Sequence, residues 1–214
     1  MTERRRPRAR NLEIATLVFC TIFVLPRSAS AAPEPIFGVT VSIAPGDDGK
    51  DVRDRDWVYA QLDLAEHLYA PLGVHVHVAQ FRTLDARLAR IGDPKERDAF
   101  APLVTPGTID VFVVRSLRDA DVKTLYRMGV TWDSHTTPSR RYIVLSAEAK
   151  RSSLAHELGH YLGIQPHSPV KNNLMSYDRE DDQVFLDASQ AALVTHAARV
   201  FRASGSLQVF GLTP

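Results

Sequence analysis

The stretch His156-Glu157-Leu158-Gly159-His160-Tyr161-Leu162-Gly163 constrains the fold more strongly than any other part of the sequence. It continues an apolar run that begins at Leu154, and this pattern predicts a helix. Residues four positions apart lie on one face of a helix, so His156 and His160 lie one above the other. Two imidazoles in that arrangement can bind one zinc ion, and the neighbouring Glu157 can handle a metal-bound water.

The residues that follow extend this motif. Gly163 lies three positions after His160, where it can end the helix in a left-handed turn. His167 comes next, and Met175 follows it by eight positions. The whole segment resembles the signature of the metzincin clan of zinc peptidases, in which H-E-x-x-H-x-x-G-x-x-H precedes a turn with a Met below the metal. The interval from His167 to Met175 is similar to that of the matrixins, and Ser176-Tyr177 is similar to serralysins and astacins.

One feature departs from the clan. Three residues, Ile164-Gln165-Pro166, separate Gly163 from His167, where the clan has two. We predict that the additional residue forms a small bulge and that His167 is still the third ligand. Two alternatives stay open at this point. Glu180 has a spacing suited to a two-His, one-Glu site although it begins an acidic run typical of a solvated loop, and His135 could reach the cleft from a neighbouring loop.

The resemblance to metzincins implies a zinc cofactor and a set of roles. It assigns the metal ligands to His156, His160 and His167. It makes Glu157 the general base that takes a proton from the metal-bound water during attack on a peptide carbonyl. Tyr177 would donate a hydrogen bond to the oxyanion, and Met175 would be an apolar floor below the ligands.

The rest of the chain predicts alternating strands and helices. Strands are expected at 39–43, 74–78, 109–114, 129–132 and 142–145, and helices at 58–72, 84–91, 154–162 and from Asp187 to about Phe201. The last helix begins with a predicted capping box, in which Asp187 is the cap and the side chain of Gln190 reaches back to it. The run 109–114 is almost continuously apolar, which predicts a strand covered on both faces, whereas 129–132 is expected at a sheet edge. The pattern supports an α/β class. The resemblance narrows this to a minimal metzincin-like zincin fold, with a twisted mixed sheet, an active-site helix and a small C-terminal subdomain.

The first 31 residues have the composition of a signal peptide. A basic segment precedes the apolar stretch 14–25, and Ala29-Ser30-Ala31 is a small-residue cleavage site. The apolar stretch is shorter than the ~20 residues that a membrane span needs. We therefore predict cleavage after residue 31 and a secreted catalytic domain at 32–214, extracellular or periplasmic, with an uncleaved membrane anchor as the alternative.

Charge and cysteine content exclude other classes. The chain has 26 basic and 25 acidic residues, and without its first 31 residues these numbers become 20 and 23. The predicted mature protein is therefore slightly acidic, which argues against nucleic acid as a partner. The single cysteine, Cys20, lies in the predicted signal peptide, so the mature domain is expected to have neither a disulfide framework nor a free thiol.

Together these features predict a secreted zinc-dependent endopeptidase that acts on protein or peptide substrates. Two other classes remain open, namely a non-catalytic interaction module that keeps zinc as a structural ion, and a zinc hydrolase of a non-peptide amide. Glu157 argues against the first of these, because a purely structural site usually fills all four zinc positions with protein ligands.

Overall fold

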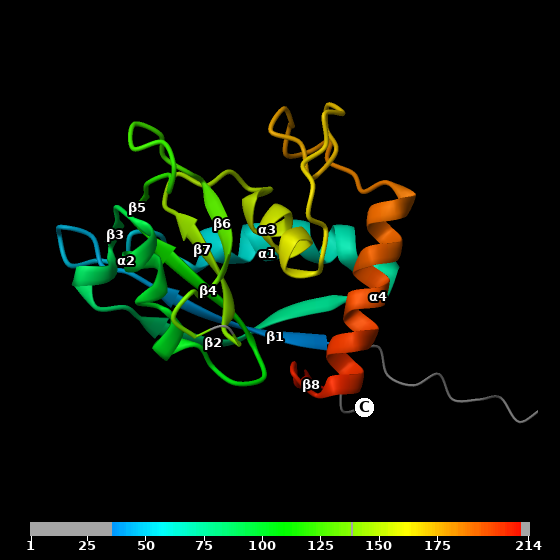
Figure 1. The fold of residues 1–214 in the computed structure, drawn as a ribbon, viewed down its shortest axis with the longest axis horizontal. Coiled ribbons are helices and arrows are strands. Elements are labelled where there is room, and N and C mark those ends of the chain that lie inside the picture. The colour runs from blue at the N-terminus through cyan, green and yellow to red at the C-terminus, as the bar shows by residue number, and fades with distance from the viewer. Residues whose placement is uncertain (1–35, 138, 211–214) are drawn as a thin grey trace, which may run out of the picture. The chain divides into compact units, whose positions relative to one another are not determined.

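A mixed β-sheet with the strand order β2-β1-β4-β7-β6 is the centre of the computed structural model (Figure 1). Its strands are β1 (Ile36–Ile43), β2 (His75–Thr83), β4 (Ile109–Val114), β6 (Gly129–Asp133) and β7 (Arg141–Ser146). β1 pairs in parallel with β2 and β4, and β4 pairs in parallel with β7. At the edge β6 runs antiparallel to β7, and β8 (Val209–Phe210) runs antiparallel to β1. The predicted mixed α/β sheet and the predicted edge strand are confirmed.

The structure describes residues 36–137 and 139–210, all within one unit that spans 33–214. The predicted signal peptide at 1–31 lies outside the described residues, so its cleavage stays a prediction. Within the described ranges, no helix is long and apolar enough to cross a membrane.

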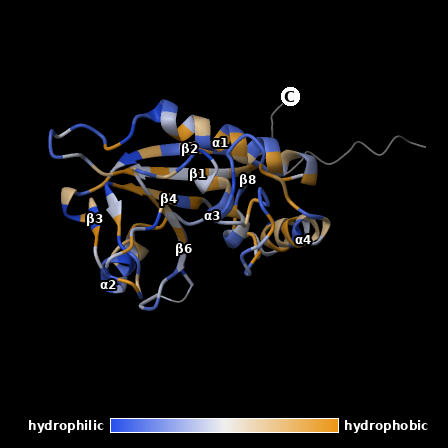
Figure 2. Ribbon diagram, turned by 90° about the horizontal axis from the view of Figure 1, so that it is seen from above, coloured by the Kyte–Doolittle hydropathy of each residue, from blue (hydrophilic) through white to orange (hydrophobic). Residues whose placement is uncertain are grey.

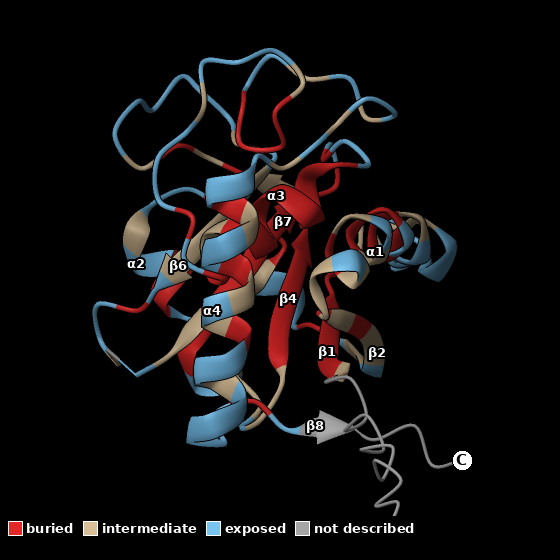
Figure 3. Ribbon diagram, turned by 90° about the vertical axis from the view of Figure 1, so that its right-hand side faces the viewer, coloured by how far each residue is buried: buried red, intermediate tan, exposed pale blue. Residues whose placement is uncertain are grey.

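Among the residues that the structure describes, four α-helices flank the sheet: α1 (Arg55–Tyr69), α2 (Pro94–Asp98), α3 (Ser153–Tyr161) and α4 (Ala188–Ser204). Short 3₁₀ turns occupy Ala70–Leu72, Ala86–Leu88 and Ala101–Leu103, and β3 (Arg90–Ile91) pairs with β5 (Ser116–Leu117) in a separate ribbon. Figure 2 shows the hydrophobic residues gathered on the strands and on the helix surfaces beside them. Figure 3 shows β1, β4, β7 and α3 as the most buried elements of the described chain, with α4 exposed along its outer side.

The strand β4 is buried at every position, as its apolar sequence predicts. Val111 and Val113 belong to the core cluster shared with α1 and α3, whereas Phe112 belongs to a second cluster on the other face. There the ring of Phe112 stacks on Phe100 with centroids 4.6 Å apart and meets Tyr142 edge to face. The side chains alternate between faces because successive residues of a strand point in opposite directions.

The predicted short helix at 84–91 is wrong. Only Ala86–Leu88 forms a 3₁₀ turn, which Asp85 caps, and the chain then extends into β3. The backbone oxygen of Ala89 accepts hydrogen bonds from two residues of the segment that leads into β5, and Ile91 is buried below them. Pairing with a segment distant in sequence therefore overrides a helix-like spacing of apolar residues.

The C-terminal helix begins as predicted. The carboxylate of Asp187 accepts from the backbone N–H of Gln190 at 2.9 Å, and the Gln190 side chain accepts from the Asp187 N–H at 3.0 Å. This reciprocal capping box satisfies two backbone donors that the first helical turn leaves free. The helix ends at Ser204, three residues later than predicted, followed by Gly205 with a φ of 66°.

Candidate metal centre

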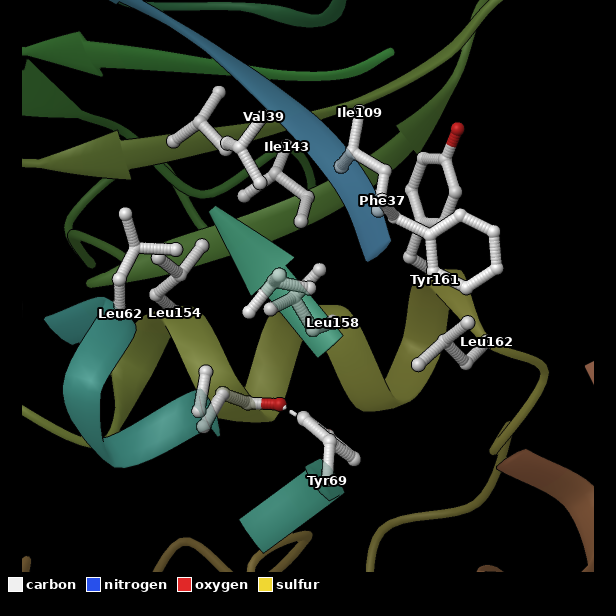
Figure 4. Packing of buried hydrophobic residues seen from close by; sticks show 14 of the residues in the cluster. Phe37, Val39, Leu62, Tyr69, Ile109, Ile143, Leu154, Leu158, Tyr161 and Leu162 are labelled. Atoms are coloured by element: carbon white, nitrogen blue, oxygen red, sulfur yellow. Dashed lines mark hydrogen bonds between the residues drawn. The ribbon is translucent and has the colours of Figure 1, made fainter. Parts of the chain in front are cut away.

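Helix α3 is held by its apolar side against the sheet (Figure 4). Leu154, Leu158 and Leu162 pack among residues of β1, β4 and β7. From α1, the Tyr69 hydroxyl donates a 2.6 Å hydrogen bond to the backbone oxygen of Ala155. Because this side of α3 is anchored, the opposite side presents His156, Glu157 and His160 to the cleft.

Backbone carbonyls orient the two helical imidazoles. The Nδ1 atom of His156 lies 2.8 Å from the Leu174 oxygen, and that of His160 lies 2.7 Å from the Ile164 oxygen. A carbonyl oxygen only accepts hydrogen bonds, so both rings carry their proton at Nδ1 and present a lone pair at Nε2. Histidines that bind a metal are typically held in this way by a partner on the second nitrogen.

The structure brings His167 to the same point. One nitrogen from each of His156, His160 and His167 lies within 4.8 Å of the other two, and the Nε2 atoms of His160 and His167 are 3.3 Å apart. A tetrahedral zinc ion with bonds of about 2.0–2.1 Å separates its ligand atoms by about 3.4 Å. The three imidazoles therefore fit one ion.

The electrostatics of the three rings favour the form that binds a metal. Burial lowers the pKa of His156 to about 3, and burial also lowers the pKa values of His160 and His167. All three imidazoles are consequently neutral at pH 7, and a neutral imidazole is the form with a lone pair for a metal.

The additional residue before His167 is accommodated at the surface. Gly163 has a φ of 98° and ends the helix in the predicted left-handed conformation. Ile164 is fixed at both ends, because it is buried, its N–H donates to the Gly159 oxygen at 2.9 Å, and its own oxygen faces His160. Gln165 and Pro166 are exposed. The chain therefore lengthens where no packing is disturbed, and His167 still reaches the cluster.

Glu157 lies in a buried position beside the histidines, with 5% of its surface exposed. Burial raises the pKa of its carboxyl group to about 7, against the opposing effect of hydrogen bonds from Thr131. The Thr131 hydroxyl lies 2.6 Å from the Glu157 backbone oxygen and 3.1 Å from Oε2. A methyl group on Gly129 would lie 2.8 Å from Cγ of Glu157. Only glycine at position 129 of β6 therefore leaves room for the Glu157 side chain. A carboxyl group with this pKa can accept and return a proton near neutral pH.

The segment that carries Met175 is held against α3 beside the cluster. The sulfur of Met175 packs against Gly159, and its backbone N–H donates to the Asn173 side chain at 2.9 Å. The side-chain amides of Asn173 and Gln190 exchange two hydrogen bonds of 2.9 Å, which tie this turn to the first turn of α4. This pair is not among the contacts predicted from the sequence. The capping box at Asp187 identifies Gln190 as a capping residue, but no local pattern indicates its second partner.

Tyr177 lies at the mouth of the cleft, with 66% of its surface exposed. Its ring stacks on His167 with centroids 4.3 Å apart, and its hydroxyl is 3.4 Å from Nδ1 of that histidine. The structure thus places Tyr177 beside the third imidazole, close to the cluster.

The two alternative ligands lie elsewhere. His135 is exposed and packs against Trp132, and its backbone N–H donates to Asp98. Glu180 forms a surface ion pair with Lys171 at 3.0 Å. Within the part of the chain that the structure describes, neither joins the three-histidine cluster.

An open cleft of about 580 Å³ runs over the cluster. β6 forms one wall, the loop from Asp119 to Met128 a second, and Tyr177 and Arg179 the end beyond Met175. No pattern in the sequence indicates that Arg127 and Arg179 line the cleft. Arg179 donates to Ser152 at 2.9 Å and to the Ser176 oxygen, while Arg127 forms an ion pair with Asp119.

No protein-family model and no curated protein matches this sequence. Solved structures match its fold. The crystal structure of metalloproteinase-II from Bacteroides fragilis aligns with a TM-score of 0.55 at 13% identity, over 79% of this chain and 55% of that one. The fold is metzincin-like. Archaemetzincin from Methanopyrus kandleri aligns with a TM-score of 0.52 at 15% identity, over 76% of this chain and 96% of that one.

These identities establish likeness of fold alone, and the chain spans about half the length of the Bacteroides protein (55%). The predicted metzincin-like fold is thus confirmed at the level of architecture. The narrower likeness to matrixins, serralysins and astacins is not confirmed.

Proposed function

We propose that the protein is a zinc-dependent endopeptidase. The observation that carries this proposal is the convergence of three neutral imidazoles on one point, with the carboxyl group of Glu157 directly beside them. His156, His160 and His167 would hold the ion. When bound, zinc supplies a Lewis acid and lowers the pKa of a coordinated water toward neutrality. Three protein ligands leave a fourth position for that water, as in catalytic rather than structural zinc sites.

Glu157 takes the proton from the attacking water and delivers it to the departing amine. Its carboxyl group is buried directly beside the histidines, so it can accept the proton from the water and return it to the amine from one position. Thr131 keeps the carboxyl group in place from β6. The Tyr177 hydroxyl, at the mouth of the cleft, is our candidate for the hydrogen bond to the oxyanion.

The substrate is proposed to be an extended protein or peptide segment. β6 is the edge strand of the sheet and lines the cleft, so its unpaired backbone groups can hydrogen-bond an added strand. We also propose that the chain acts after export and cleavage near Ala32. Mass measurement of the secreted protein tests this, and a retained N-terminus in a membrane fraction would contradict it.

Metal analysis paired with a digest of a mixed protein substrate tests the activity. We expect one zinc per chain and cleavage that a chelator abolishes and added zinc restores. Glu157→Ala should keep the zinc and lose activity by a factor of at least about 10²–10⁴, the usual contribution of a general base. Zinc binding without any cleavage by the native chain would favour the non-catalytic module, and cleavage restricted to small amides would favour the alternative hydrolase.

A further inference from the structure

Ser153 is a buried hydroxyl that the proposed mechanism does not use. It is the first residue of α3, only 2% of its surface is exposed, and it lines the cleft. Its Oγ has no hydrogen-bond partner among the described residues. Ser153 precedes His156 by three positions and Glu157 by four, so all three share one helix face. A buried polar group in this position is satisfied when a ligand in the cleft supplies the partner.

Arg179 faces the cleft at the same end of α3. Its half-buried guanidinium donates from Nε to the Ser152 hydroxyl at 2.9 Å and from a second nitrogen to the Ser176 oxygen. Both acceptors are uncharged, and the fork has further N–H groups that these contacts do not use. Lys150 is exposed and lines the same part of the cleft. Two cationic side chains thus accompany the unpartnered hydroxyl.

Other arginines of the cleft are already engaged. Arg127 forms its ion pair with Asp119, and Arg141 is paired with Asp133 at 2.6 Å. Arg97 donates from Nη2 to a backbone oxygen and lies over the ring of Trp132, although its Nε has no partner among the described residues. Arg179 differs from the paired arginines because its charge is held in the cleft by neutral groups.

One acidic residue close to Arg179 in the sequence, Asp181, is occupied elsewhere. The carboxylate of Asp181 accepts hydrogen bonds from the backbone N–H groups of Arg151 and Ser152, at 3.0 and 3.1 Å. Asp181 and Glu157 both exert a favourable charge effect on Arg179. These two carboxylates offset part of the positive charge of Arg179. Lys150 adds a second cation, and the N-terminal end of α3 contributes the partial positive charge of the helix dipole.

We propose that Ser153, Lys150 and Arg179 form a subsite that binds a carboxylate of the substrate, one helical turn from Glu157. A turn of helix is about 5.4 Å long, and a residue of extended peptide spans about 3.3 Å. A group bound at Ser153 therefore belongs to the residue beside the scissile bond. It is either an Asp or Glu side chain, as endopeptidase cleavage requires, or the terminal carboxylate, in which case the enzyme removes single C-terminal residues. Arginine binds both groups with the same planar fork.

This inference rests on the proposed peptidase activity, and its test has a cleavage arm and a binding arm. In the first, the zinc-loaded chain digests a peptide library, and matched peptides with Glu or Gln beside the cleaved bond are then compared. We expect kcat/KM to favour the acidic peptide by about tenfold or more, since charged partners form the stronger hydrogen bonds. A second pair, with a free or an amidated C-terminus, separates the two sources of carboxylate.

Variants identify the residues responsible. Arg179→Gln should abolish the acidic preference, and Arg179→Lys should keep part of it. Ser153→Ala should reduce the preference without a loss of thermal stability, because its hydroxyl has no partner among the described residues. If Arg179→Gln destabilises the turn at Ser176, Ser153→Ala still measures the contribution of the subsite to the acidic preference. Arg199→Gln removes the same charge from the exposed side of α4 and is the matched control.

The binding arm separates failure of the subsite from failure of the activity. Calorimetry on the Glu157→Ala chain measures the Kd of the same acidic and amide peptides without turnover. Tighter binding of the acidic peptide supports the subsite if that difference is lost in the double variant Glu157→Ala, Arg179→Gln. This result holds even if the native chain cuts no substrate. Equal Kd values for both members overturn the subsite, whether or not the chain is a peptidase.

Discussion

The sulfur of Met175 packs against Gly159 so closely that a methyl group on that glycine would lie 2.8 Å from it. The same methyl group would lie 3.2 Å from the Tyr69 hydroxyl, which holds the backbone of α3 at Ala155. The packing of α3 against Met175 and Tyr69 thus depends on a residue without a side chain. This relationship fixes how near the Met175 turn comes to the helix.

Gly159→Ala should therefore destabilise the protein, although alanine is the better helix former by about 1 kcal/mol. Overpacking against Met175 and Tyr69 is expected to cost about 1–3 kcal/mol. Urea denaturation of the zinc-free chain measures the change. Adding Met175→Leu, which shortens the side chain, should recover part of the loss. A gain in stability for Gly159→Ala alone would show that the turn moves away freely.

His167→Ala should weaken zinc binding more than substitution of either alternative ligand, His135 or Glu180. Loss of a direct ligand is expected to exceed the roughly 10–100-fold effect of losing a residue that only orients one. His135→Ala and Glu180→Ala are matched controls, because both lie outside the cluster. Competition with a chromogenic chelator gives the three affinities. If His135→Ala or Glu180→Ala removes the metal while His167→Ala retains it, the third ligand is wrongly assigned.

Deleting Gln165 should be tolerated. This residue is exposed, whereas Ile164 carries the contacts of the turn. The deletion restores the usual metzincin spacing before His167. We expect zinc affinity to stay within about threefold of the native value, which the same chelator assay measures. A drop as large as that of His167→Ala would mean that the additional residue is required for the third ligand to reach the ion.

The buried carboxyl group of Asp110 should make stability depend on pH. Burial raises its pKa to about 6, against hydrogen bonds from the Thr105 backbone and hydroxyl. A raised pKa means that the folded protein holds the proton more tightly than the unfolded chain. This contribution is fully present below about pH 4 and is lost as the pH rises through about 6.

Asp110→Asn removes that titration. Relative to the native chain, the variant should gain about 2 kcal/mol of unfolding free energy between pH 4 and pH 7.5. Urea denaturation of both proteins at the two pH values gives the difference directly, and the contributions of all other groups cancel. A difference that stays constant with pH would show that Asp110 ionises normally in the folded state.

The sequence predicts those parts of the site that lie within one turn of helix or one loop. The spacing of His156 and His160, the left-handed Gly163 and the capping box at Asp187 all depend on neighbours a few residues away. The structure has each of them as predicted. The position of His167 also follows, because Ile164 is fixed by bonds within the same turn.

Contacts between distant segments could not be predicted in this way. Thr131 reaches Glu157 across 26 positions, and Tyr69 reaches Ala155 across 86. Such partners depend on how strands and helices pack against one another, and the spacing of apolar residues in the sequence does not predict that packing. The error at 84–91 has the same origin, since pairing of β3 with β5 decides the conformation there.

The amide pair of Asn173 and Gln190 provides a measurable coupling between the Met175 turn and α4. Both side chains are buried, and two hydrogen bonds of 2.9 Å join them. Asn173→Ala should cost about 1–3 kcal/mol, because it removes the acceptor of two buried donors, the Gln190 Nε2 group and the Met175 N–H. It should also lower zinc affinity, since the Leu174 oxygen that orients His156 lies on the same turn.

A double-mutant cycle isolates the pair itself. Gln190→Ala alone also removes half of the capping box at Asp187, so its cost includes a cap worth about 1 kcal/mol. Once Asn173 is already Ala, the loss of Gln190 should cost about 1–2 kcal/mol less than it does in the native chain. Urea denaturation of the four proteins gives the coupling energy, and chelator competition follows zinc affinity in parallel. Strictly additive losses would show that the turn is held by Leu174 and Met175 packing, with the amide pair contributing nothing of its own.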